Sequence, residues 1–238
     1  MSVNEHLLSK RLEQVGKFVP QNARLADIGS DHAYLPVALM LQHQITYAIA
    51  GEVVKGPYQS AKRQVQKNGL SHQIDVRLAD GLEAITLADT IEAITIAGMG
   101  GTLIRSILEN GKQKNRLSHQ ERLILQPNIG ERSLREWLMQ NRYEIIDETI
   151  LEENQKIYEI IVAQPVKEVM FYTQQELLFG PILRQHPSEI LCRKWEREAT
   201  QRQYVLTQLQ QASVLNQSKY DATKQELEWI QEELTRWS

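Results

Sequence analysis

The sequence predicts an α/β protein in which helices flank a largely parallel β-sheet, followed by a helical C-terminal domain. Over residues 1–165, apolar, β-branched runs alternate with helical patterns, as in right-handed βαβ units. After residue 189 almost nothing interrupts a helical pattern. We therefore expect two domains, residues 1–165 and 166–238.

Composition is that of an ordinary globular protein. Of the 238 residues, 42% are hydrophobic and 24% are charged, so the chain can bury a sizeable core. No apolar run approaches the roughly 18 residues of a membrane helix, and the charged, leucine-containing N-terminus differs from a signal peptide. We expect a cytoplasmic protein. The single cysteine, Cys192, excludes cysteine-rich zinc sites, and the net charge of −3 still allows a local basic patch.

The first elements alternate between helix and strand. Apolar residues at helical spacing predict a helix over residues 7–18, and a short buried strand follows over residues 23–29. A second helix is expected over residues 33–44, where Pro36 is tolerable because it falls in the first turn. The apolar run 45–54 predicts a second strand.

The same alternation continues through the middle of the chain. A proline begins and a glycine ends the helix over residues 57–70, which is the order that helix termini favour. Strands are expected over residues 74–82 and 91–101, and the helix over residues 102–111 ends at a glycine.

A hairpin closes the predicted sheet. A strand over residues 122–128 and a helix over residues 131–141 complete the alternating pattern. Two further strands, residues 143–154 and 156–166, follow each other without a helix and therefore form an antiparallel hairpin. We expect one antiparallel strand at or near the edge of the sheet.

The region after residue 165 differs in character. Thr173, three residues before Glu176, predicts a capping box at the start of a short helix. Apolar residues then recur three, four and seven residues apart, which predicts two long helices joined by a turn at residues 216–219. We expect an antiparallel, coiled-coil-like helical hairpin that contacts the substrate rather than a second enzyme.

Three acidic residues stand at the ends of three successive strands: Asp27, Glu52 and Asp80. Open α/β sheets bind ligands outside the carboxyl ends of their strands. Glu52 follows Gly29 at close to the spacing, about 20 residues, at which an acid binds a ribose diol in Rossmann folds. Gly29 lets a ligand approach the backbone closely. The pattern indicates a Rossmann-like nucleoside site.

The turn GSDHAYL favours a ligand without phosphate. A pyrophosphate site needs more glycine, and Asp31 would repel phosphate. S-adenosyl-L-methionine has a ribose, an adenine, a sulfonium and an ammonium. Asp27 and Asp31 would face its cationic amino-acid end, Glu52 its diol and Asp80 its adenine amine. A metal site at Asp27, Asp31 and His32 is a weaker alternative, because a strand residue and a turn would have to converge.

Five segments carry a resemblance to a known family: LADIGSDHAYLPVAL, GEVVKGPYQSAKRQVQKNGL, RLADGLEAI, ITIAGMGGTLIRSIL and LILQPNIGERSLREWL. They resemble the bacterial tRNA (adenine-22-N1)-methyltransferases, class I S-adenosylmethionine enzymes that act on the D-arm region of tRNA. The resemblance covers residues 1–165, and the family's C-terminal domain is also coiled-coil-like. It implies methylation of adenine N1 at position 22 of tRNA.

The resemblance also implies where the cofactor binds, and no metal is expected. The expected cofactor-binding residues are Asp27, Ile28, Gly29, Ser30, Asp31, His32, Glu52, Val53, Asp80, Gly81, Ala97, Gly98 and Met99.

The turn AGMGG after the fourth strand bears on the reaction. None of its side chains can accept a hydrogen bond from an exocyclic amine, whereas Met99 could pack on a flat base. A ring nitrogen with a free lone pair, such as adenine N1, needs positioning more than a general base. Two catalytic residues are expected: Asp31, which would stabilise the cationic product, and Asn128, which with Gln126 would hydrogen-bond the adenine edge.

The expected macromolecular partner is tRNA, bound by a monomer in solution. The target base must leave its stack, which suggests recognition of tRNA shape and phosphates. The available cations are Lys10, Arg11, Arg105, Lys112, Lys114, Arg116, Arg193, Lys194 and Arg197.

Two other functions stay open at this point. A nicotinamide-dependent oxidoreductase would share the fold, although the missing glycines and Asp31 disfavour it. A non-catalytic RNA-binding or scaffold protein would carry a vestigial pocket, although the intact series of acids disfavours that reading.

Overall fold

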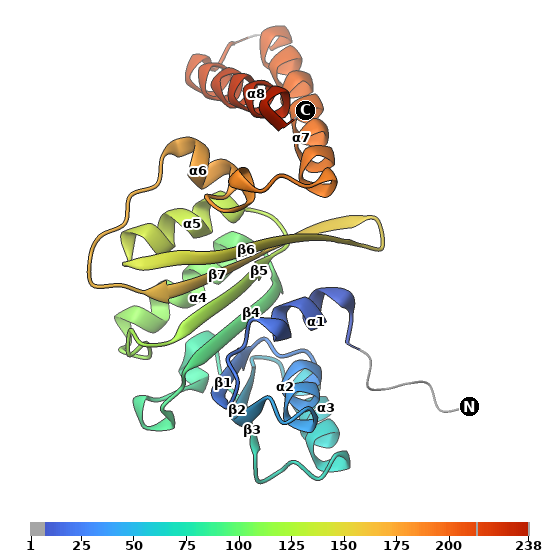
Figure 1. Cartoon of the computed structure of the whole chain (residues 1–238), viewed down its shortest axis with the longest axis vertical. Coiled ribbons are helices and arrows are strands. Elements are labelled where there is room, and N and C mark those ends of the chain that lie inside the picture. The colour runs from blue at the N-terminus through green and yellow to red at the C-terminus, as the bar shows by residue number, and fades with distance from the viewer. Residues whose placement is uncertain (1–7, 213, 238) are drawn as a thin grey trace. The chain divides into compact units, whose positions relative to one another are not determined.

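The computed structural model of the chain describes residues 8–212 and 214–237 (Figure 1). The chain divides into two compact units, one that extends to Ile182 and one that begins at Leu183. None of the described helices has the length and apolar character that a membrane span requires.

The first unit is built on one seven-stranded sheet with the order β3-β2-β1-β4-β5-β7-β6. The strands are β1 Ala23–Ile28, β2 Ile45–Glu52, β3 Ile74–Leu78, β4 Ala93–Met99, β5 Arg122–Pro127, β6 Tyr143–Glu153 and β7 Lys156–Pro165. Strands β1 to β5 pair in parallel, whereas β7 pairs antiparallel with both β5 and β6. The predicted Rossmann-like fold, with an antiparallel strand next to the edge, is confirmed.

Helices cover both faces of this sheet. They are α1 Lys10–Lys17, α2 Tyr34–Leu41, α3 Lys55–Lys67, α4 Gly101–Gln113, α5 Glu131–Gln140 and α6 Gln174–Phe179. Residues of α1, α2 and α3 pack in one core cluster, and residues of α4 and α5 pack in another on the opposite face. Two short 3₁₀ helices between β3 and β4, Gly81–Ala84 and Leu87–Asp89, were not predicted.

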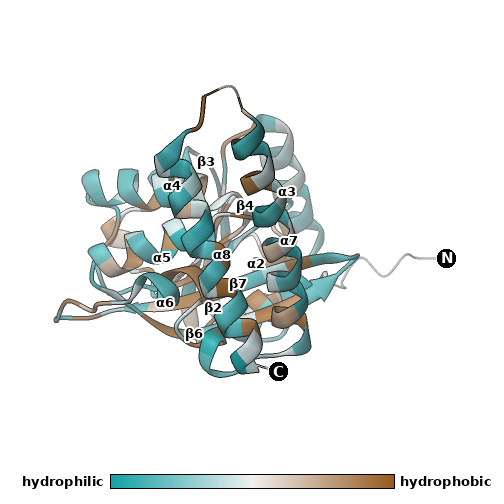
Figure 2. Cartoon of the chain, turned by 90° about the horizontal axis from the view of Figure 1, so that it is seen from above, coloured by the Kyte–Doolittle hydropathy of each residue, from teal (hydrophilic) through white to brown (hydrophobic). Residues whose placement is uncertain are grey.

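The alternation of side chains along the strands separates the two cores. In β1, Leu25 packs in the first cluster, and its neighbour Ala26 packs in the second. Figure 2 shows hydrophobic residues concentrated in the strands and hydrophilic residues along much of the helix surfaces.

A buried ion network joins the end of the first unit to its sheet. The Arg135 guanidinium, fully buried, donates to Glu148 Oε1 over 2.7 Å and to Glu159 Oε2 over 2.5 Å. Glu148 also accepts from the backbone N–H of Ile182 over 2.9 Å. The compact unit therefore continues past residue 165, where the domain boundary was expected, because this network holds the segment up to Ile182 on the sheet.

The second unit is a helical hairpin of α7 Glu189–Gln211 and α8 Gln217–Trp237. Arg202 Nε bonds Glu226 Oε2 over 3.0 Å, and Gln210 Nε2 bonds the Tyr220 hydroxyl over 3.0 Å, so the helices run antiparallel as predicted. The turn lies before residue 217 rather than at residues 216–219. The Asn216 side chain accepts from the Lys219 N–H over 3.0 Å, and thus this polar segment begins α8 instead of forming the turn.

Candidate functional site

The sheet reverses its strand order between β1 and β4, and their carboxyl ends open the crevice at which such sheets bind ligands. Asp27 ends next to Thr95 in the register, and Ala97 lies opposite Gln126. The predicted residues of β1, β2 and β4, with Asn128 just beyond β5, therefore lie along one edge of the sheet.

Asp27 is fixed at the centre of this edge. It is only 4% exposed, and its two carboxylate oxygens accept from the Ser30 hydroxyl over 2.5 Å and the Thr95 hydroxyl over 2.6 Å. Burial raises the pKa of Asp27, although both hydroxyls lower it. Sequence reasoning missed Thr95, yet a threonine inside the apolar strand AITIAGM was a usable signal.

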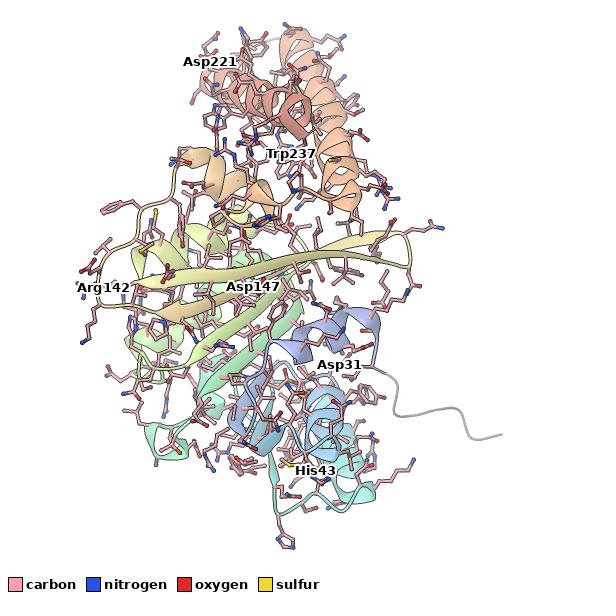
Figure 3. The ribbon with its side chains drawn as sticks, in the orientation of Figure 1. Asp31, His43, Arg142, Asp147, Asp221 and Trp237 are labelled. Carbon is pink, nitrogen blue, oxygen red and sulfur yellow. The ribbon has the colours of Figure 1, made fainter. Side chains whose placement is uncertain are left out.

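These bonds also weaken the metal alternative, because the carboxylate that would be its first ligand is already held by two hydroxyls. The Asp31 side chain is 78% exposed, and its Oδ1 lies 3.6 Å from His32 Nε2. Figure 3 shows Asp31 near helices α1 and α2.

The turn after β1 has an unusual backbone. Gly29 has a φ of +69°, and three successive non-glycine residues, Asp31, His32 and Ala33, have φ values of 44°, 66° and 59°. Left-handed conformation costs a non-glycine residue about 1–2 kcal/mol. Such strain clusters at ligand sites, so the turn is a structural mark of the site that no sequence pattern displayed.

Glu52 closes the other side of the turn. The side chain is buried, and burial raises its pKa, whereas the backbone N–H groups of His32 and Asp31, which face the carboxylate, lower it. Among the described residues, Glu52 Oε1 has no hydrogen-bond partner. A buried acceptor without a partner is costly, and a ligand hydroxyl would satisfy it.

The backbone N–H groups of the turn point into the protein. Those of Gly29 and Ser30 donate to the Gly51 carbonyl over 2.9 and 3.2 Å, and those of Asp31 and His32 face Glu52. A pyrophosphate requires such N–H groups to be free. This geometry disfavours a dinucleotide and fits a nucleoside with a diol.

Three more predicted residues lie just beyond β2 and β3. Leu78, the last residue of β3, pairs with Glu52, which brings Asp80 and Gly81 to the same edge. Asp80 is exposed, as is Val53 at 63%. An exposed apolar side chain beside an acid can pack on an adenine ring.

The segment after β4 is held by β5. Asn128 Nδ2 donates to the Gly98 carbonyl over 2.8 Å, and the Asn128 N–H donates to the Met99 carbonyl over 2.7 Å. Buried Gln126 accepts from the Gly98 N–H and from Arg11 and donates to Pro127 and Asn128. Because the Gln126 amide is fully satisfied within the protein, its expected contact with the adenine edge is not supported. The exposed Asn128 retains capacity.

Met99 lies against the turn rather than out in the crevice. A Cβ atom built on Gly29 would stand 2.0 Å from the Met99 methyl carbon. Gly29 therefore has two reasons to be glycine, its backbone conformation and this close approach.

Arg11 reaches the site from α1, which the sequence did not indicate. Its Nη1 donates to Gln126 Oε1 over 2.5 Å, and it lies 3.3 Å from the Cβ position of Gly98. No local pattern could reveal this, because residues 11 and 126 meet only through the fold.

Other predicted cations lie away from the crevice. Lys112 bonds Asn141 Oδ1 over 2.6 Å, and Lys114 pairs with Glu83. Helix α4 runs from the carboxyl end of β4 to the amino-terminal edge of the sheet, and Figure 3 shows Arg142 at the opposite end of the sheet from Asp31. The basic segment after α4 is therefore not part of the site.

The chain is similar to proteins of one family. Residues 25–232 match the family model "TrmK: tRNA (adenine(22)-N(1))-methyltransferase". The chain is 48% identical over 221 residues to the tRNA (adenine(22)-N(1))-methyltransferase of Bacillus subtilis (strain 168), covering 91% of this chain and 92% of that protein.

Solved structures agree with this similarity. The B. subtilis M1A22 tRNA methyltransferase TrmK superposes with a TM-score of 0.90 at 44% identity, over 96% of this chain and 99% of that one. Streptococcus pneumoniae Sp1610, a putative tRNA (m1A22) methyltransferase in complex with S-adenosyl-L-methionine, gives 0.86 at 44% identity, over 96% and 100%. M. capricolum TrmK in complex with S-adenosyl-homocysteine gives 0.82 at 28% identity, over 97% and 99%.

Proposed function

We infer that this chain, which belongs to the tRNA (adenine(22)-N(1))-methyltransferase family, transfers a methyl group from S-adenosyl-L-methionine to adenine N1 in tRNA. The observation that carries this proposal is the pairing of an unpartnered, buried Glu52 oxygen with a turn whose N–H groups face inward. This pairing suits a nucleoside diol and does not suit a pyrophosphate.

The residues of the crevice fit the cofactor. When bound, S-adenosyl-L-methionine supplies a methyl group activated on a sulfonium. Glu52 would accept from the ribose hydroxyls, Asp80 and Val53 would hold the adenine, and Asp27 would bring negative charge to the cationic end. The proposed site also includes Ile28, Gly29, Ser30, Asp31, His32, Gly81, Ala97, Gly98 and Met99.

The acceptor side positions a base rather than deprotonates it. The N1 lone pair of adenine is free near neutral pH, so orientation dominates the rate. Asn128, which holds Gly98, would present its remaining amide capacity to the adenine edge. Asp31 would lower the energy of the cation that develops on the base, because its exposed carboxylate stands at the mouth of the crevice.

We propose that the helical unit contacts tRNA and that position 22 in the D-arm region is the target. Replacing Arg193, Lys194 and Arg197 of α7 together by glutamine should weaken tRNA binding and lower its salt dependence by about one log unit per lost phosphate contact. Affinity for S-adenosylhomocysteine should not change. Glutamine at Lys219 and Lys224 of α8 is the control, and equal loss in both variants would refute a specific role for α7.

The deciding experiment is mass spectrometry of nucleosides from unmodified tRNA incubated with the protein and S-adenosyl-L-methionine. One N1-methyladenosine, mapped to position 22, is the expected product. Binding of NAD in place of S-adenosylhomocysteine in calorimetry would instead favour an oxidoreductase. Cofactor binding with no methyl transfer to any RNA would favour a scaffold.

A further inference from the structure

We propose that Arg11 binds the carboxylate of the cofactor's amino-acid end, and this inference rests on the proposed function. The claim concerns one side chain, from a helix more than a hundred residues away in sequence from the β5 residue it contacts (|i−j| = 115).

The guanidinium of Arg11 is held firmly at the crevice. Nη1 donates to Gln126 Oε1 over 2.5 Å, and Cζ lies 5.4 Å from the centroid of the Tyr158 ring. The side with no Cβ at Gly98, whose φ is +78°, faces the same group. A planar donor fixed in this way loses little entropy when it binds an oxyanion.

Its charge is not balanced within the described part of the chain. No carboxylate there lies within ion-pair distance of the Arg11 guanidinium, which has one neutral amide and one aromatic ring as partners. The buried Arg135 differs, since two glutamates neutralise it. A half-buried guanidinium without an anion is costly unless a ligand supplies one.

The cofactor's carboxylate needs such a group. The turn after β1 has no N–H to offer, because those of Gly29 and Ser30 donate to Gly51 and the next two face Glu52. Nearby carboxylates of Asp27 and Glu52 would repel the ligand's carboxylate. Gly98 ends β4, which is one strand, about 5 Å, from β1, where the amino-acid end is expected.

The test compares Arg11→Met with the parent by calorimetry with S-adenosylhomocysteine. We expect affinity to fall about 10- to 100-fold, as for loss of a charge-assisted hydrogen bond, and Arg11→Lys to recover part of it. Arg24→Met is the control, because Arg24 also stacks on a tyrosine, Tyr47, at 4.2 Å, but at the opposite end of β1. Thermal melting checks that every variant folds.

The decarboxylated analogue of S-adenosylhomocysteine identifies the group that Arg11 binds. The parent should bind this analogue about 10- to 100-fold more weakly, and Arg11→Met should bind both ligands alike. An equal loss for both ligands in the variant, or no loss, would overturn the proposal. So would a defect confined to tRNA affinity at saturating S-adenosylhomocysteine, because the oxyanion would then be a phosphate. Failure of the parent to bind S-adenosylhomocysteine would instead refute the proposed function.

Discussion

Replacing Glu52 by glutamine should change cofactor affinity and protein stability in opposite directions. The substitution keeps the shape of a buried side chain and removes its charge. In the parent, Oε1 has no hydrogen-bond partner among the described residues, and burial raises the pKa of the carboxyl group. The parent therefore carries a cost at neutral pH that a bound diol would offset.

The magnitude follows from hydrogen bonds to a charged acceptor, each worth about 1.5–3 kcal/mol. Loss of one such bond lowers the affinity for S-adenosylhomocysteine about 10- to 150-fold, at 1.36 kcal/mol per tenfold change. The free energy of unfolding at neutral pH should rise by about 1 kcal/mol, because a neutral amide replaces an unpartnered charge.

The pH dependence has a definite sign. A carboxyl group whose pKa is raised on folding stabilises the protein below its unfolded value of 4.5, and this stabilisation is lost as pH rises through the folded pKa. The stability advantage of Glu52→Gln should therefore shrink on acidification. Cofactor affinity of the parent should weaken as pH falls through the same range, and the variant should show less of this dependence.

Calorimetry and urea unfolding at several pH values measure both effects. Glu121→Gln is the matched control, because Glu121 is equally buried but accepts from the N–H groups of Ser118 and Gln120. That variant should lose stability and keep its cofactor affinity. Unchanged affinity in Glu52→Gln, or a loss as large in Glu121→Gln, would show that Glu52 does not hold the diol.

Two further substitutions test the turn and the buried network. Gly29→Ala should abolish cofactor binding, because a Cβ would stand 2.0 Å from the Met99 methyl; Gly69→Ala, with a similar φ of +71° and open space around it, should cost stability alone, and calorimetry with urea unfolding separates them. Arg135→Met should lower the free energy of unfolding by about 3–5 kcal/mol, as it leaves two buried glutamates unpaired. Acidification, or glutamine at both glutamates, should restore most of that loss in urea unfolding; no recovery would mean that packing, not charge, is responsible.

The sequence predicted the parts of the site that local patterns encode. Asp27 and Glu52 were located because each ends an apolar run, and parallel strands bring their carboxyl ends to one edge. Arg11 and Thr95 had to be found in the structure, since each acts on a partner far away in the sequence. The role of Gln126 was mistaken for the same reason, because its amide is satisfied by contacts that only the fold creates.

The domain boundary shows the same limit. The change of texture near residue 165 is real in the sequence, but the compact unit ends at Ile182. A buried arginine in a helix with a charged, exposed-looking pattern gives no sign that it holds two glutamates and the segment after α6. Boundaries set by buried charge cannot be read from hydropathy.

The direction of the backbone N–H groups explains why one glycine suffices in a turn where dinucleotide folds use several. Those folds need glycines so that the backbone can approach a pyrophosphate with its N–H groups outward. Here Gly51 and Glu52 accept these groups, and the ligand meets carboxylates instead. Such a turn repels every anion, including the carboxylate of the cofactor itself. The protein must therefore supply positive charge from outside the turn, and the Arg11 guanidinium beside Gly98 is placed to do so.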